Sequence, residues 1–203
     1  MFDMFTLLAL QDGWARLAAD GAAFRALFAH MPIEEGLLDE WHGKLAPGGA
    51  PDAVSFRAAW APGAEPPPVV VVQLLEEPLE KDCLAYSGGI VDGREQIEMA
   101  LKETAVVTIY AQHQELLRAL HVVVRSILVS AFKWFIEVGY ESLDYAGGGD
   151  IQPERDLMPE DLGIYVRTQR WVAISKPVLG TFDVDPGKPW RVRAAPVGGG
   201  VTL

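Results

Sequence analysis

The chain contains 203 residues, of which half are hydrophobic and 22% are charged, so it can bury the core of one globular domain or of a domain with an appendage. Its 17 basic and 28 acidic residues give a net charge of −11. This balance argues against a protein that wraps nucleic acid, because binding to the phosphate backbone depends on basic side chains. The single cysteine, Cys83, excludes an intramolecular disulfide and fits a reducing compartment.

No secretory signal or membrane span is predicted. Residues 1–10 are apolar but carry Asp3 where a signal peptide has basic residues. The most apolar internal run, residues 120–136, is interrupted by Arg125 and Lys133 and falls short of the ~20 apolar residues that a membrane span needs. We therefore expect a soluble intracellular protein that does not associate with membranes.

Residues 1–45 are predicted to form short helices. Apolar side chains recur there at helical spacing, and Asp12 and Asp20 are suitable capping or turn residues. The sequence EEGLLDEWHGKL, residues 34–45, predicts a third short helix. Residues 46–51, which are rich in proline and glycine, predict a linker.

Two strands are predicted next. Residues 54–60 place apolar side chains on one face with a period of two, and residues 69–77 begin with four valines, which is typical of a buried strand. The proline-rich residues 61–68 predict a stiff loop between them. A further loop is predicted at residues 87–93, which contain three glycines.

Residues 95–111, EQIEMALKETAVVTIYA, combine helix-forming residues in their first half with a period of two throughout. From Ile97 to Ala111, apolar residues occupy every odd position except that of Glu103, and no capping or breaking residue divides the segment. The pattern predicts one unusually long strand with a bend or bulge at residues 102–104.

Residues 114–138 show the clearest helical pattern, with a continuous apolar face and Gly139 in the position that favours a positive φ after a helix. Residues 140–145 and 163–178 alternate with a period of two and predict two more strands. Residues 181–203 contain proline and glycine without a sustained period, so they predict an extended arm.

This order of elements predicts an α+β fold: a mostly antiparallel sheet with one long helix packed on a face, short N-terminal helices and an extended C-terminal arm. We expect three parts, namely an N-terminal helical segment at 1–50, an α+β core domain at 51–180 and the arm at 181–203. The alternating βαβ series of a doubly wound nucleotide-binding fold is missing from the pattern.

No motif predicts catalysis, a cofactor or a metal site. The three glycines at 147–149 lack the Lys and Ser/Thr of a phosphate-binding loop and predict a turn between strands. Acidic residues cluster at 76–82 and 154–161, where charge on a solvated loop is the simplest interpretation. The four histidines, His30, His42, His113 and His121, do not have the sequence spacing of metal ligands.

Large side chains fall on both faces of the predicted strands: Tyr165 and Trp171 share one face of residues 163–178, and Ile164, Val166, Val172 and Ile174 share the other. The outer face of the sheet is therefore expected to be covered, either by the N-terminal helices or by a neighbouring subunit, where Tyr, Trp and Arg are enriched. The predicted arm favours assembly, because a proline-rich extension bearing Trp190, Arg191 and Arg193 can lie across a partner.

Residues 54–176 follow the order strand, long helix, strand, glycine-rich turn and arginine-bearing strand. The sequences that show it are VTIYAQHQELLRALHVVVRSIL, then GYESLDYAGGGDIQPE and LMPEDLGIYVRTQRW, with VSFRAAW and PPPVVVVQLLEEPLEKDCLAYSGG upstream. In this order the chain resembles the tail-terminator and neck-region proteins of contractile-tailed bacteriophages. The resemblance implies a structural virion protein that forms a ring, typically of six copies, and caps the tail tube and sheath.

The resemblance also implies partners. The homo-oligomeric ring would meet the tail tube protein, the sheath protein and a neck connector, with DNA passing through its lumen without specific binding. It would be found in the virion, and in the host cytoplasm during assembly, and it needs no catalytic residue, cofactor or metal. Subunit or tube contacts are expected from six residues of the last strand and the arm: Arg167, Arg170, Trp171, Trp190, Arg191 and Arg193.

Two other interpretations remain open. One is a neck or head-completion connector, although such connectors are often mainly helical and this chain is predicted to be rich in strands. The other is a soluble ligand-binding or enzymatic α+β domain that uses Glu76, Glu77 and Glu80.

Overall fold

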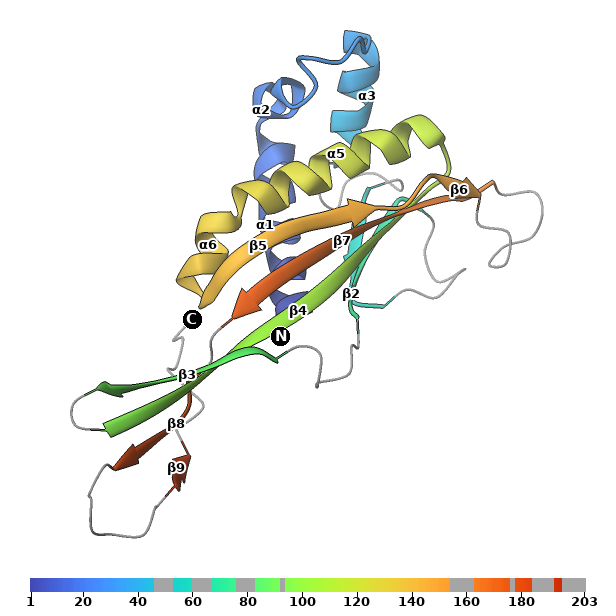
Figure 1. Cartoon of the computed structure of the whole chain (residues 1–203). Helices are drawn as coiled ribbons and strands as arrows, with labels where there is room; N and C mark the ends of the chain where they lie inside the picture. The colour runs from blue at the N-terminus through green and yellow to red at the C-terminus, as the bar shows by residue number, and fades with distance from the viewer. Residues whose placement is uncertain are drawn as a thin grey trace.

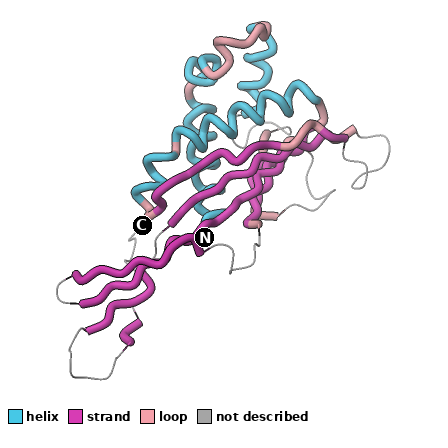
Figure 2. Tube along the Cα trace, in the orientation of Figure 1, coloured by secondary structure: helices cyan, strands magenta, loops and turns pink. Residues whose placement is uncertain are grey.

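A computed structural model of the chain describes residues 1–45, 53–59, 67–75, 83–91, 94–153, 163–175, 178–183 and 192–194. The fold is α+β, with several helices on a mixed, mostly antiparallel sheet (Figures 1 and 2). The helices are α1 (Phe2–Ala19), α2 (Gly21–Ala26), α3 (Glu35–Leu45), α5 (Gln114–Ser130) and α6 (Phe132–Glu137). The strands are β1 (Ser55–Arg57), β2 (Val69–Leu74), β3 (Cys83–Val91), β4 (Arg94–Ala111), β5 (Tyr140–Gly148), β6 (Gln152–Pro153), β7 (Tyr165–Ser175), β8 (Val178–Asp183) and β9 (Val192–Ala194).

Strand β4 organises the sheet. It is one strand of 18 residues, as the alternation in residues 95–111 predicted. Its C-terminal half lies between β2 and β7, which extend the sheet to β1 and β5, and its N-terminal half lies between β3 and β8. Among the pairings that the structure describes, only that of β1 with β2 is parallel.

The prediction of a bulge at residues 102–104 is wrong. The ladder between β4 and β7 runs without a shift from Leu101 opposite Ser175 to Ala111 opposite Tyr165. One register shift against β8 lies after Ile97, and another lies beside Cys83 of β3, opposite Ala100 and Leu101. The irregularities therefore lie where β4 changes neighbours.

The helices share one hydrophobic core with the sheet. Odd-numbered residues of β4, such as Val107 and Ile109, are fully buried against α5, which contributes Leu117 and Leu128. The same cluster includes Phe2 of α1. Residues from the predicted segment 1–50 thus pack directly on strands of the predicted core 51–180.

The expectation of one long helix with short N-terminal helices is corrected in two ways. The predicted helix at 114–138 is divided at Ala131 into α5 and α6, although Gly139 ends it with the expected positive φ of +105°. Residues 2–19 form a single helix of 18 residues, longer than the 17 residues of α5. Asp12 therefore lies inside a helix, whereas Asp20 caps α2 by accepting hydrogen bonds of 3.0 Å from the backbone nitrogens of Ala22 and Ala23.

Two predicted loops are strands. Residues 87–91 belong to β3, which is held by its antiparallel pairing with β4 despite its glycines. Gly147 and Gly148 belong to β5, and the positive φ of Gly147, +116°, accompanies a shift of register against β7. Tertiary pairing overrides the low strand propensity of glycine at both places.

The extended C-terminal arm is not confirmed. Residues 178–183 form β8 alongside β4, and residues 192–194 form β9 alongside β8. Several other predictions lie outside the described residues, namely the linker at 46–51, the loop at 61–66, the acidic segments at 76–82 and 154–161, Trp190 and Arg191.

Candidate functional site

The first candidate surface is the face of the sheet opposite the helices. Even-numbered residues of β4 and β7 point to this face, and most of them are half-buried: Val106, Thr108, Tyr110, Val166, Thr168, Val172 and Ile174. Helix α1 packs with α5 on the other face, and in Figure 1 the strands pass in front of it. The N-terminal helices therefore do not cover the outer face, which was one of the two coverings expected. No described helix lies over it.

Strand β7 separates the residues that the sequence had grouped as an interface. Arg170 is exposed on the face without helices, opposite Val106 of β4 and Gly147 of β5. Arg167 and Trp171 are odd-numbered and point to the helix-covered face, because side chains of a strand alternate. Trp171 is 1% exposed and lies in the core, so its side chain is not part of the surface.

A second candidate surface is the part of the sheet that extends beyond the helices. Strand β3, the N-terminal half of β4, β8 and β9 form this projecting ribbon (Figures 1 and 2). Arg193 lies in β9, opposite Thr181 of β8, so the structure places its backbone in the ribbon. The ribbon exists because β4 is long enough to pair with two successive sets of neighbours.

A polar cluster lies between α5 and the inner face of β7. Gln169 is fully buried, and its Nε2 donates a hydrogen bond of 2.8 Å to the backbone oxygen of His121. Its Oε1 accepts a hydrogen bond of 3.0 Å from Nε1 of Trp171, whose ring makes an edge contact with Tyr145 at 5.3 Å between centroids. Sequence reasoning missed this cluster. The signal that could have found it is a glutamine in the inward-facing row of a strand.

His121 is the titratable centre of that cluster. Its side chain is 7% exposed, and among the described residues its buried Nε2 has no hydrogen-bond partner. Burial, followed by the positive charges of Arg167 and Arg125, lowers the pKa of His121 from 6.5 to about 4. The imidazole is therefore neutral at pH 7, although two cations act on it.

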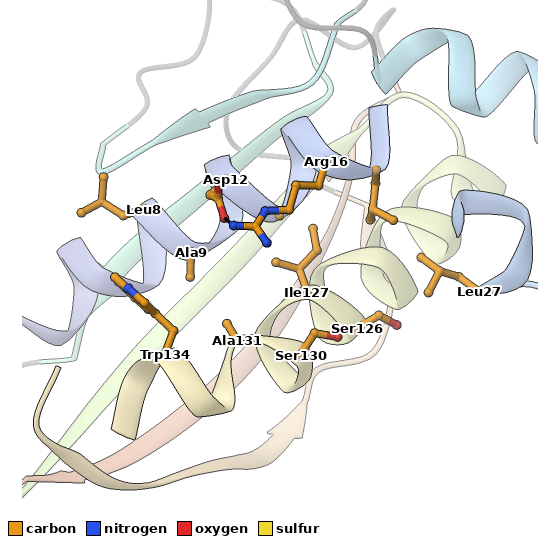
Figure 3. A pocket seen from close by; sticks show the side chains of 12 residues that line it. Leu8, Ala9, Asp12, Arg16, Leu27, Ser126, Ile127, Ser130, Ala131 and Trp134 are labelled. Carbon is orange, nitrogen blue, oxygen red and sulfur yellow. Dashed lines mark ion pairs between the residues drawn. The ribbon is translucent and has the colours of Figure 1, made fainter. Parts of the chain in front are cut away.

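A groove of about 630 Å³ separates α1 from α5 and α6 (Figure 3). Leu8 and Trp134 line one end, Leu27 the other, and the exposed ion pair between Asp12 and Arg16, at 2.7 Å, lies on its rim. Among the described residues, its lining contains the hydroxyls of Ser126 and Ser130 but no histidine.

Over the described part of the chain, no three potential metal ligands of the types His, Cys, Asp or Glu come together. No described helix is long and apolar enough to cross a membrane. Comparison with known proteins gave no matching family model and no significantly similar curated protein.

Proposed function

We propose that this chain is a structural virion protein, a phage tail terminator whose copies close into a ring that caps the tail tube and sheath and gives the head a docking surface. The observation that carries the proposal is the projecting ribbon, together with the sheet face beside it that no described helix covers. A sheet normally buries an apolar face against a second layer, and here the described helices supply a layer for only part of one face.

A second copy of the chain is the occupant that fits these surfaces best. A closed ring requires two different surfaces on each subunit that contact each other in a head-to-tail manner. The ribbon and the face without helices are two such surfaces, and the half-buried valine, isoleucine, threonine and tyrosine side chains of that face can pack against a neighbour. Arg170 lies on that face, and arginine is enriched at interfaces.

The charge of the chain supports the same role. A net charge of −11 on each copy gives a ring of several copies a strongly negative field. Such a field repels DNA, so DNA would pass through the lumen without binding to it. The proposed neighbours of the ring are the tail tube protein, the sheath protein and a neck connector.

The first test measures the mass of the protein in solution by sedimentation velocity across a wide concentration series. We expect a species of several chains, near six, whose population rises with concentration. Replacement of Arg170 by Glu should weaken the association of the chains, because the substitution places a negative charge on the proposed contact face. Arg118→Glu is the matched control, since Arg118 is exposed on α5, on the opposite side of the sheet.

A second test examines the activity itself. Purified protein is added to polymerising tail tube protein of the same phage, and tube lengths are measured by electron microscopy. A terminator should stop tube growth and appear as a ring at tube ends, whereas a neck connector should leave tube growth unchanged. The proposal is contradicted if the chain stays monomeric both alone and in the presence of tubes. It is also contradicted if Arg170→Glu and Arg118→Glu reduce assembly equally.

A further inference from the structure

The groove between α1 and the α5–α6 pair presents accessible apolar side chains. Its first wall is one face of α1 from Leu8 to Leu17, about 14 Å long at the rise of a helix. Its second wall runs from Ser126 of α5 to Trp134 of α6, and Figure 3 shows side chains of the two walls on either side of the same space. Leu8 is 49% exposed, so a partner that covers the groove removes apolar surface from water.

The groove has apolar ends and a closed middle. Leu8 and Trp134 lie at one end and Leu27 at the other (Figure 3). Between them Ile127 lies so close to the backbone of Gly13 that a Cβ atom there would clash with it. The two helices therefore touch in the middle of the groove, where a ligand without side chains fits best.

The charges of the groove are balanced. Asp12 and Arg16, the two charged residues of its lining, form an ion pair at 2.7 Å. A charged ligand side chain would therefore lose water without gaining a free counter-charge, which is costly. The groove favours an uncharged, apolar occupant.

The chain itself contains one segment of this kind outside the described residues. Residues 195–203, AAPVGGGVTL without its first alanine, include no Asp, Glu, Lys or Arg. At least one charged residue occurs in each of the other segments: 46–52, 60–66, 76–82, 92–93, 154–162, 176–177 and 184–191. Composition therefore selects residues 195–203.

The spacing of side chains in this segment matches the groove. Val197 and Val201 are separated by Gly198, Gly199 and Gly200. In an extended chain the two valines lie about 13 Å apart, close to the length of the α1 wall. The valines can thus contact the two apolar ends while the glycines cross the closed middle, where their backbone meets no side-chain obstacle of its own.

The position of β9 indicates which copy supplies the segment. Residues 195–203 follow β9, and β9 lies in the ribbon that extends beyond the helices of its own copy (Figures 1 and 2). Nine extended residues span at most about 30 Å, of which the groove takes about half. In the proposed ring the ribbon contacts a neighbour, so it brings the segment to the neighbour's helices.

We propose that the groove between α1 and α5–α6 is a docking site for residues 195–203 of a second copy of the chain. Val197 and Val201 contact its apolar ends, and the glycines lie over Gly13 and Ile127. The second copy as the source rests on the proposed ring, whereas recognition of the segment by the groove does not.

The first experiment measures binding of a fluorescent peptide of residues 194–203 to the full-length protein by anisotropy. We expect saturable binding that Ser130→Trp, which fills the groove, weakens tenfold or more. Val129→Trp is the matched control, because Val129 is exposed next to Ser130 but does not line the groove. A peptide with Asp at both valine positions should not bind. Equal binding to the two tryptophan variants, or equal binding of the two peptides, would overturn the docking site.

The second experiment identifies the source by sedimentation velocity of full-length variants. Ser130→Trp and Val201→Asp should each weaken association of the chains, and an equal mixture should associate more strongly than either alone. The mixture regains contacts because one variant keeps the groove and the other keeps the segment. Circular dichroism verifies that each variant is folded.

The outcomes separate this inference from the ring. Peptide binding by a chain that does not associate would overturn both the ring and the second copy as the source. Association that Ser130→Trp and Val201→Asp leave unchanged would overturn the docking contact and leave the ring standing. Arg170→Glu, which should weaken the ring, should bind the peptide as the native protein does.

Discussion

Glu103 of β4 accepts a hydrogen bond from the backbone nitrogen of Phe2, at 3.4 Å, and so links the central strand to the start of α1. Glu103 is the one charged residue in the inward-facing row of residues 101–111, and the sequence pattern offered no reason for it. The structure supplies the reason. The carboxylate lies at the positive end of the α1 dipole, and it contacts the hydroxyl of buried Tyr140, whose pKa is raised above its usual range by burial and then by this negative charge.

Replacement of Glu103 by Leu should lower the free energy of unfolding by about 1–3 kcal/mol, because it leaves the Phe2 N–H and the Tyr140 hydroxyl without their acceptor. Glu103→Gln keeps an acceptor oxygen and should cost less. Urea denaturation measures both. Glu137→Leu, on the exposed side of α6, is the matched surface control and should change stability by less than about 0.5 kcal/mol. Equal effects at the two positions would refute the linking role of Glu103.

Gly13 should not tolerate alanine, although it lies inside a helix. Alanine normally stabilises a helix interior by about 1 kcal/mol relative to glycine. At this position a Cβ atom would clash with Cγ2 of Ile127 in α5, so we expect Gly13→Ala to destabilise the protein by about 1–3 kcal/mol.

Two variants test this explanation by thermal denaturation. Gly43→Ala in α3 is the control, since a Cβ there meets no atom within 4 Å and should raise stability. The cost of Gly13→Ala should shrink in an Ile127→Ala background, which removes the clashing methyl group. Additive effects of the two substitutions would mean that α1 and α5 do not touch at this point.

The low pKa of His121 makes stability depend on pH. In the unfolded chain the imidazole titrates near its ordinary pKa of 6.5, and in the folded protein near 4. Between these values the unfolded state binds the extra proton, so the contribution of His121 is fully present above pH 6.5 and is lost as the pH falls toward 4. The slope is at most about 1.4 kcal/mol per pH unit.

The measurement compares urea denaturation of the native protein and of His121→Gln in chloride buffer from pH 7 to pH 4. Carboxylates titrate in the lower part of this range in both proteins, so the difference between the two curves isolates His121. We expect the native protein to lose stability more steeply on acidification. Parallel curves would contradict the buried, neutral state of the imidazole.

Gln169→Leu should be strongly destabilising even though it places an apolar residue in a core. The substitution removes the acceptor of the Trp171 indole and the donor to the His121 backbone oxygen, at a cost of about 1–3 kcal/mol for each unsatisfied group. Gln112→Leu, at an exposed position after β4, is the control for the same chemical change. Denaturation midpoints that are equal for the two variants would show that the network does not hold α5 to the sheet.

Local sequence patterns predicted the elements in which apolar residues recur at a regular spacing. Residues 95–111 were predicted to be one strand because a period of two in apolar residues requires an extended backbone with one buried face, and β4 confirms it. Gly139 and Asp20 were predicted as helix-ending and capping residues, because their chemistry is suited to those backbone positions, and both act so.

The remaining features depend on contacts between residues that are distant in the sequence. Residues 87–91 are a strand because β4 supplies hydrogen bonds to a segment that contains glycines. Residues 2–19 are one helix that includes Gly13, where α1 lies close to Ile127 of α5. The same holds for the polar cluster, in which Gln169 of β7 meets the backbone of His121 in α5. A sequence pattern specifies which side chains are buried together along one element, because that is a local property of the backbone. Only the tertiary structure decides which elements meet, and therefore which side of the sheet the helices cover and which charges are brought together.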